Sequence, residues 1–299
     1  MQQTPPKIQT IPVSQGITSS DVKPIRLLVL DLDGTTVGAS NQIRSQVLQA
    51  IQAVQDRGVQ VAIATGRMYR SALRFHQALN SQLPLMTYQG ALIKDPTTEQ
   101  ITRHLTVSQD FVLQLLDYFE QPELRHRLSV HAYIDDRLYV RELTQDSLEY
   151  AERSNIEPIA VGDLRQAIAH GEPTKLLAMS QQTELIDQLL VSLRQRYAPE
   201  QLYFTKSVAT FFEATHPSAN KGNAVKYLAE AVLGLQAENV MAIGDNFNDL
   251  EMIQYAGVGV AMGNAPDAVK AAADWVAPDV ELDGVAAAIE QFVLGGVQP

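Results

Sequence analysis

The 299-residue sequence predicts an α/β fold in which an α+β segment interrupts a parallel sheet. Apolar runs that suit strands buried on both faces alternate with amphipathic helices near the N-terminus. In the middle of the chain this pattern changes to hairpins mixed with helices. After His216 the alternation of helix and strand resumes. The sequence therefore predicts one α/β domain that is split by an inserted domain of roughly a hundred residues, a normal domain size.

The first part of the chain contains three apolar runs, separated by two helical patterns. The predicted strands are Ile25–Leu30, Val59–Ala64 and Leu85–Tyr88. Apolar residues recur at helical spacing over Ile43–Val54 and Ala72–Leu79. Gly58 stands where a helix C-cap is expected. Strand, helix, strand, helix, strand is the order of a parallel α/β sheet.

The middle of the chain predicts an antiparallel sheet with helices. Its predicted strands are the hairpin Leu128–Ile134 with Arg137–Arg141, the single strand Lys175–Met179, and the hairpin Leu202–Thr205 with Val208–Glu213. Its predicted helices are Phe111–Phe119 and Leu185–Tyr197. The last part returns to the parallel pattern, with helices Ala224–Leu233, Asp249–Tyr255 and Val285–Phe292 and strands Val240–Ile243 and Val258–Ala261. Hairpins mixed with helices are typical of an α+β unit.

These patterns predict four segments. Residues 1–23 form a flexible N-terminal tail, residues 24–105 the first part of the core, residues 106–214 the inserted α+β domain, and residues 215–299 the second part of the core. The tail is rich in Gln, Thr, Pro and Ser, and it lacks the basic start and apolar middle of a secretory signal.

Composition excludes several classes of partner. The 23 basic and 34 acidic side chains give a net charge of −11, which argues against binding to nucleic acid or to anionic lipid. No apolar stretch approaches the ~20 residues that a membrane crossing needs. The chain has no cysteine, which excludes disulfide and thiolate chemistry and fits a cytoplasmic protein. No obligate protein partner is evident, and an anionic substrate would have to be held by local positive groups or by a metal.

Acidic residues end the first predicted strand. Asp31 and Asp33 stand one residue apart, and ligands of α/β sheets bind outside the carboxyl ends of the strands. Taken alone, this pair is best interpreted as an acidic turn. Three further features lie at strand ends or helix starts and change that interpretation: Thr65, Lys221, and the group Asp245, Asn248 and Asp249.

Together these side chains have the chemistry that phosphoryl transfer needs. Carboxylate oxygens hold Mg²⁺, a lysine neutralises phosphoryl charge, and a threonine hydroxyl donates to a phosphoryl oxygen. Each residue also has a structural interpretation of its own, as a helix cap, a polar turn or a solvated charge. Their combination in this order favours a magnesium-dependent phosphoryl-transfer site.

Four motifs carry a resemblance to a known family. They are Asp31-Leu-Asp33-Gly34-Thr35, Thr65-Gly66-Arg67, Lys221-Gly222 and Gly244-Asp245-Asn246-Phe247-Asn248-Asp249. They resemble those of the haloacid dehalogenase superfamily, and within it the Cof-type phosphatases of subfamily IIB. The resemblance extends to Val260–Ala265 and Asp283–Val285, and it is thin between about residues 106 and 210. It implies a Rossmann-like core with an α/β cap of the C2 type inserted between the second and third motifs.

The resemblance also implies a role for each motif residue. Asp31 would attack phosphorus and form an aspartyl-phosphate, and Asp33 would act as general acid and then as general base. Thr65, Gly66 and Lys221 would bind the phosphoryl group. Mg²⁺ would be held by Asp31, by the backbone carbonyl of Asp33 and by Asp245. Asn248 and Asp249 would orient Lys221 or a metal-bound water, and the substrate would be a small phosphorylated metabolite.

Candidate substrate contacts are less specific. Arg67 and Asn264 adjoin the motifs, and Lys175 is a candidate in the cap. Lys206, His131 and Arg137 are weaker candidates, for which a solvated or structural role is favoured. Four aromatic residues are predicted to form the core of the cap: Tyr133, Tyr139, Phe211 and Phe212.

Three residues depart from the family pattern, and two other functions stay open. Thr36 stands where an apolar residue is usual, Gln89 where an asparagine is common, and Asn220 where serine or aspartate is frequent. Gln89 makes the substrate specificity uncertain, so that sugar phosphates, pyridoxal phosphate, flavin mononucleotide and biosynthetic intermediates all fit. The alternatives are a phosphomutase of the phosphomannomutase type and an inactive metabolite-binding relative.

Overall fold

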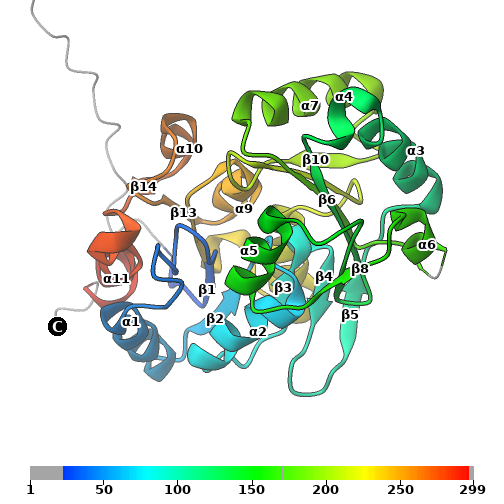
Figure 1. Cartoon of the computed structure of the whole chain (residues 1–299). Helices are drawn as coiled ribbons and strands as arrows, with labels where there is room; N and C mark the ends of the chain where they lie inside the picture. Colours follow the sequence, from blue (N-terminus) through cyan, green and yellow to red (C-terminus); the bar gives the residue numbers. More distant parts are fainter. Residues whose placement is uncertain (1–22, 170, 296–299) are drawn as a thin grey trace, which may run out of the picture.

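The computed structural model describes residues 23–169 and 171–295, and a parallel sheet lies in one half of the molecule (Figure 1). The strand order is β14-β13-β12-β1-β2, and every pairing in this sheet is parallel. The strands are β1 (Leu27–Leu30), β2 (Gln60–Ile63), β12 (Val240–Gly244), β13 (Val258–Ala261) and β14 (Trp275–Val276). The predicted α/β class and parallel core are therefore confirmed. The predicted tail, residues 1–23, lies outside the described residues except for Lys23.

Helices cover both faces of this sheet. They are α1 (Ser45–Asp56), α2 (Tyr69–Ala78), α8 (Lys221–Lys226), α9 (Leu250–Tyr255), α10 (Asp267–Ala272) and α11 (Gly284–Ile289). Leu28 and Leu30 of β1 share an apolar cluster with α1, α2 and α11, whereas Leu27 and Val29 share another with α8 and α9. Burial on both faces explains why β1 is a continuous apolar run. Within the described ranges, no helix has both the length and the apolar character needed to cross a membrane.

The third predicted strand does not extend the parallel sheet. β3 (Leu85–Thr87) is joined to the main sheet by a single parallel bridge between Ala64 and Met86. Its ladder is antiparallel, with β4 (Leu92–Lys94), which in turn pairs with β5 (Ile101–His104). The sequence pattern did not predict β4 and β5, because these strands are short and β5 is largely exposed.

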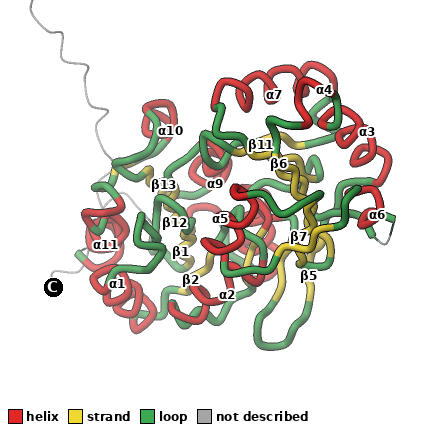
Figure 2. Tube along the Cα trace, in the orientation of Figure 1, coloured by secondary structure: helices red, strands yellow, loops and turns green. Residues whose placement is uncertain are grey.

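The inserted segment forms a second sheet of six strands with its own helices (Figure 2). The strand order is β10-β11-β9-β6-β7-β8, and the pairings are antiparallel except for β7 with β8. The strands are β6 (Ser129–Ile134), β7 (Arg137–Val140), β8 (Pro158–Ala160), β9 (Lys175–Met179), β10 (Tyr203–Thr205) and β11 (Phe211–Thr215). The helices are α3 (Gln109–Phe119), α4 (Pro122–Arg125), α5 (Gln145–Ser154), α6 (Leu164–Ile168) and α7 (Thr183–Arg196). This α+β unit, called the cap below, confirms the predicted insertion; its boundaries at residues 106 and 214 stay predictions.

The two faces of the cap sheet have different neighbours. One face packs against α3, α6 and α7 in a cluster that includes Phe212 and the half-buried Tyr139. Residues of the other face, among them Tyr133 and Leu177, belong to the same apolar cluster as Tyr88 of the core. The cap therefore packs directly onto the core. Tyr139 and Phe212 are cap core residues, as predicted, whereas Tyr133 packs against Tyr88 where the cap meets the core.

A buried ion pair lies where the cap meets the core. Lys175 on β9 and Glu213 on β11 are nearly inaccessible, and their charged groups are 2.9 Å apart. Lys175 Nζ also donates to the carbonyl oxygen of Gly66 at 2.9 Å, and Gln89 Nε2 donates to both carboxylate oxygens of Glu213 at 3.3 and 3.4 Å. Burial disfavours the Lys175 ammonium, but the adjacent carboxylate outweighs this and raises the Lys175 pKa. Two cap strands are thus bonded to two core loops.

Removing one partner of this pair should destabilise the fold strongly. Glu213→Ala leaves the Lys175 ammonium buried without its carboxylate, and we expect the free energy of unfolding in urea to fall by about 3–5 kcal/mol. The exposed pair of Lys206 with Asp187 in the same cap is the matched control, since Asp187→Asn should change the value by less than about 1 kcal/mol. Equal losses in the two variants would contradict the assignment.

Candidate active site

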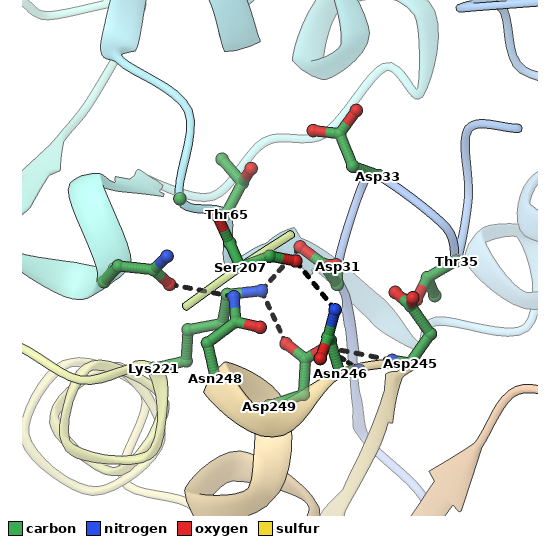
Figure 3. Close-up of polar contacts among 12 residues, drawn as sticks. Asp31, Asp33, Thr35, Thr65, Ser207, Lys221, Asp245, Asn246, Asn248 and Asp249 are labelled. Carbon is green, nitrogen blue, oxygen red and sulfur yellow. Dashed lines mark hydrogen bonds and ion pairs between the residues drawn. The ribbon is translucent and has the colours of Figure 1, made fainter. Parts of the chain in front are cut away.

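Three neighbouring strands of the parallel sheet end in polar residues that gather at one edge (Figure 3). Asp31 follows β1, Thr65 comes two residues after β2, and Asp245 follows β12. β1 pairs with β2 on one side and with β12 on the other. Strands that follow in the sequence are therefore added first on one side of β1 and later on its other side. A switch point of this kind is where α/β proteins bind their ligands. The structure thus brings together residues that are up to 214 positions apart (245 − 31).

Lys221 lies at the centre of this group. It is the first residue of α8 and is completely buried. Its Nζ donates to Asp31 Oδ1 at 2.6 Å and to Asp249 Oδ1 at 2.5 Å. Burial opposes the charged form of Lys221, but the two carboxylates outweigh burial and raise its pKa. The two carboxylates therefore favour the ammonium form of Lys221 beside Asp31.

Asn220, which departs from the family pattern, has a clear structural role here. Its side-chain oxygen accepts a hydrogen bond from the backbone N–H of Asn223 at 2.7 Å, so Asn220 is the N-cap of α8. Serine or aspartate would cap the helix in the same way. The departure therefore leaves the position of Lys221 unchanged.

Three buried carboxylates, those of Asp31, Asp245 and Asp249, have oxygens within 4.8 Å of one another. Burial, together with the charge of Asp249, raises the pKa of Asp31 well above its usual range and that of Asp245 to about 7. One ammonium does not balance three carboxylates in a desolvated site. Oxygen ligands and uncompensated negative charge are what a divalent cation of the Mg²⁺ type requires, so this cluster could hold one.

The loop after β1 supports Asp245. Thr35 Oγ1 donates to Asp245 Oδ1 at 2.9 Å. Gly34 has φ +82°, and a Cβ at this position would lie 2.3 Å from Asp245 Oδ2. Only glycine allows the loop to pass so close to that carboxylate. Thr36 Oγ1 donates to the carbonyl oxygen of Asp31 at 2.6 Å, so this departure from the family pattern uses its hydroxyl to hold the loop.

Asp33 is held by Arg67. The guanidinium donates through Nε and Nη2 to the two carboxylate oxygens, at 2.7 and 2.6 Å, and Nη2 also donates to Asn41 Oδ1 at 2.9 Å. The same guanidinium lies 4.7 Å from the centre of the Phe75 ring. Burial alone would raise the pKa of Asp33, but Arg67 outweighs it and lowers that pKa. Sequence analysis predicted Arg67 as a substrate contact, and the structure adds this bidentate partner.

Asp31 and Asp33 line a cavity of about 280 Å³ between the core and the cap. The other core residues on its wall are Thr65, Gly66, Arg67, Asn246 and Asn248. The cap contributes Tyr150, Arg153, Ser154, Lys175, Ser207, Val208, Thr210 and Phe211. The fully buried Thr65 accepts a hydrogen bond from the backbone N–H of Arg67 at 3.2 Å, which leaves its own hydroxyl proton free for a ligand.

The remaining predicted residues lie in different surroundings. Lys175 is on the cavity wall, whereas Asn264 donates to the carbonyl oxygen of Gly34 at 2.8 Å and is absent from that wall. Asn248 Nδ2 donates to Gln89 Oε1 at 3.1 Å, and Asp249 directly contacts Lys221.

The three weaker candidates are not on the cavity wall. His131 is buried, and burial lowers its pKa to about 3. Arg137 is exposed and lines a neighbouring hollow, and Lys206 pairs with Asp187.

Sequence reasoning missed most of the cap side of the cavity. Tyr150, Arg153 and Ser154 lie on one face of α5, at positions i, i+3 and i+4, and α5 itself was not predicted. The half-buried Phe211 was assigned to the cap core but borders the cavity. Nothing in the local pattern marks these residues, because their position depends on how the cap packs against the core. Asn246, which donates to the carbonyl oxygen of Ser207 at 2.7 Å, could have been found from its place in the fourth motif.

Comparison with known proteins gives a consistent result. The family profile described as haloacid dehalogenase-like hydrolase matches residues 28–289. The chain is 31% identical over 269 residues to 5-amino-6-(5-phospho-D-ribitylamino)uracil phosphatase YitU of Bacillus subtilis, covering 89% of this chain and 97% of that protein. It is 27% identical to pyridoxal phosphate phosphatase YbhA of Escherichia coli, covering 87% of this chain and 96% of the relative.

Comparison with solved structures indicates the same family. A haloacid dehalogenase-like hydrolase from Bacteroides thetaiotaomicron has a solved structure that matches this one with a TM-score of 0.77 at 26% identity, covering 89% of this chain and 98% of that chain. The profile spans both parts of the core and the cap between them. The chain therefore belongs to the haloacid dehalogenase-like hydrolases, among the Cof-type phosphatases that its motifs predicted.

Proposed function

We propose that this protein hydrolyses a small phosphorylated metabolite through an aspartyl-phosphate on Asp31, with bound Mg²⁺. The observation that carries the proposal is the position of Asp31, which lies on the cavity wall with its carboxylate 2.6 Å from the Lys221 ammonium. A carboxylate oxygen can attack phosphorus when nearby positive charge offsets the charge of the phosphoryl group. Lys221 supplies such charge, and the Thr65 hydroxyl can donate to a phosphoryl oxygen.

Asp33 is the proposed general acid and general base. Both Asp31 and Asp33 line the cavity, so the leaving oxygen of an ester attacked by Asp31 can lie near Asp33. Asp33 would donate a proton to that oxygen and then accept one from the water that hydrolyses the intermediate. Arg67 holds both oxygens of Asp33, fixes its direction and lowers its pKa. The lowered pKa favours the base form of Asp33, so its acid step requires a proton to be taken up against this shift. An arginine bound this tightly within the protein supports a positioning role more than direct recognition of substrate.

The metal would be held by Asp31, by the backbone carbonyl of Asp33 and by Asp245. Asp249 is the third carboxylate of the cluster, but its oxygens accept hydrogen bonds from Lys221 and from the backbone N–H groups of Asp245 and Asn246. These contacts favour an orienting role for Asp249. When bound, Mg²⁺ neutralises negative charge on the carboxylates and on the phosphoryl group.

The substrate would be a phosphate ester with a compact leaving group. A cavity of about 280 Å³ is slightly smaller than the roughly 300–1,000 Å³ usual for small-molecule sites. Tyr150, Phe211 and Arg153 on its wall would contact the leaving group with aromatic surface and one positive charge. The relatives named above act on a phosphorylated ribitylaminouracil and on pyridoxal phosphate. A screen of these esters and of sugar phosphates, read by release of inorganic phosphate, tests the proposal; isomerised sugar phosphate without free phosphate would indicate a mutase.

Replacing the nucleophile should abolish turnover. Asp31→Asn removes the attacking oxygen, and we expect kcat for p-nitrophenyl phosphate to fall by about 10³-fold or more. The circular dichroism spectrum should be unchanged, because asparagine has the same size. Retention of a tenth of the wild-type kcat would reject Asp31 as nucleophile.

Removing the metal should also abolish turnover, and adding the metal back should restore it. Excess EDTA should eliminate phosphate release, and Mg²⁺ added beyond the chelator should restore it. Asp245→Asn should raise the Mg²⁺ concentration needed for half-maximal activity, because one ligand loses its charge. Full activity in EDTA would show that the reaction needs no metal.

Substitution of Asp33 should separate the two half-reactions. An alkyl phosphate needs a protonated leaving oxygen, whereas p-nitrophenolate leaves without one. Asp33→Asn should therefore abolish turnover of glycerol 3-phosphate but still give a burst of p-nitrophenolate, followed by slow hydrolysis of the phosphoenzyme.

Substitution of Arg67 supplies the matched comparison. Arg67→Gln should lower kcat for glycerol 3-phosphate more than for p-nitrophenyl phosphate, because it loosens Asp33. Equal losses for both substrates in both variants would contradict the assignment of Asp33 as general acid.

A further inference from the structure

The turn between β6 and β7 carries two adjacent aspartates with different surroundings. Asp135 and Asp136 form a two-residue hairpin turn, and both have positive φ, 51° and 54°. Positive φ at both positions is typical of a type I′ turn, in which aspartate and asparagine are well tolerated. The Asp135 side chain is exposed, whereas Asp136 is only 17% exposed. The turn therefore directs one carboxylate of the cap into the protein.

Asp136 reaches the core and caps helix α2. Its Oδ1 accepts from the backbone N–H of Tyr69 at 3.0 Å, and its Oδ2 accepts from the backbone N–H of Arg70 at 3.1 Å. Helix α2 has no side-chain cap at its own N-cap residue, Met68. The first N–H groups of a helix need an acceptor, and its N-terminus favours negative charge. A residue of the cap thus supplies the capping group of a core helix.

Two more donors complete the contact. Tyr88 donates its hydroxyl to Asp136 Oδ1 at 2.7 Å, and Arg70 Nε donates to Oδ2 at 3.2 Å. Hydrogen bonds to an ionised carboxylate are stronger than those between neutral groups. Four donors from the core therefore converge on one carboxylate of the cap.

The segments that Asp136 binds are those that flank the active site. Helix α2 begins two residues after Arg67, the partner of Asp33, and Tyr88 directly precedes Gln89, which bonds to Asn248. Asp136 itself is absent from the wall of the active-site cavity. Its contacts therefore act on the position of the cap and not on the substrate.

We propose that Asp136 is a positioning residue that seats the cap on the core and so holds the active-site cavity at its working width. Loss of the Asp136 contacts would let the cap populate positions in which Tyr150, Arg153 and Phe211 stand away from Asp31. The apparent affinity for substrate falls in proportion to the fraction of molecules in the seated arrangement. A smaller fraction of molecules with the cap seated therefore gives a higher KM.

Distance measurement between cap and core tests the proposal without requiring turnover. The chain has no cysteine, so Gln49→Cys on α1 and Ser192→Cys on α7, both exposed, accept spin labels selectively. We expect one narrow distance distribution in the otherwise wild-type chain and an added longer population in Asp136→Asn. Asp135→Asn, in the same turn, is the matched control and should keep the narrow distribution.

Kinetics with p-nitrophenyl phosphate supply the second readout. Asp136→Asn should raise KM at least about fivefold, in proportion to the loss of the seated population, with a smaller change in kcat. Tyr88→Phe removes one of the four donors, so its KM should lie between those of wild type and Asp136→Asn. It also provides a milder variant if Asp136→Asn does not fold.

Wild-type distances in Asp136→Asn, altered distances with an unchanged KM, or equal effects of Asp135→Asn would each overturn the proposal. Absence of any hydrolysis by the wild-type chain would count against the proposed function, and the distances would still decide the role of Asp136.

Discussion

The burial of one ammonium group among carboxylates is the constraint on which the rest of the site depends. Lys221 has no access to solvent, so its charge is stable only because Asp31 and Asp249 contact it directly. This requires that the end of β1, the start of α8 and the turn after β12 meet at one point. The parallel pairing of β1 with β12 and the helix cap at Asn220 bring them there. The same constraint leaves a surplus of negative charge, which makes the cluster suited to a divalent cation.

Three further contacts extend this constraint to the cap. Lys175 donates to the carbonyl oxygen of Gly66, and Gln89 bonds to Glu213 on one side while accepting from Asn248 on the other. Gln89 can do this because its backbone is in the left-handed region, with φ 59°, and its side chain passes close to Gly66, where a Cβ would lie 2.4 Å from Gln89 Nε2. The phosphate-binding loop proposed at Thr65–Arg67 is therefore held from both domains.

The core side of the site could be predicted from sequence because each of its residues stands next to a strand that the local pattern predicts. Asp31, Thr65 and Asp245 each follow an apolar strand, and a parallel sheet necessarily brings such strand ends together. The partner of Arg67 could not be predicted, since Asp33 lies 34 positions away and the contact depends on loop geometry.

The cap side of the site and one strand of the core were harder to predict for related reasons. Tyr150 and Arg153 face the cavity only because α5 packs over it. β3 was expected to continue the parallel sheet, but only the bridge between Ala64 and Met86 joins it there, and its ladder is with β4. An apolar run of three or four residues does not specify its partner strand.

The split core also constrains how the chain acquires its structure. The central strand β1 has one neighbour at Gln60–Ile63 and the other at Val240–Gly244, with the whole cap encoded between them. The ribosome synthesises the N-terminal part first, so β1 emerges long before β12. During that interval the unpaired edge of β1 is open to wrong partners. The cap, whose strands pair among themselves, can fold in that interval as a nested unit. Pairing of β12 with β1 is then a late, long-range step, and it brings Asp245 beside Asp31.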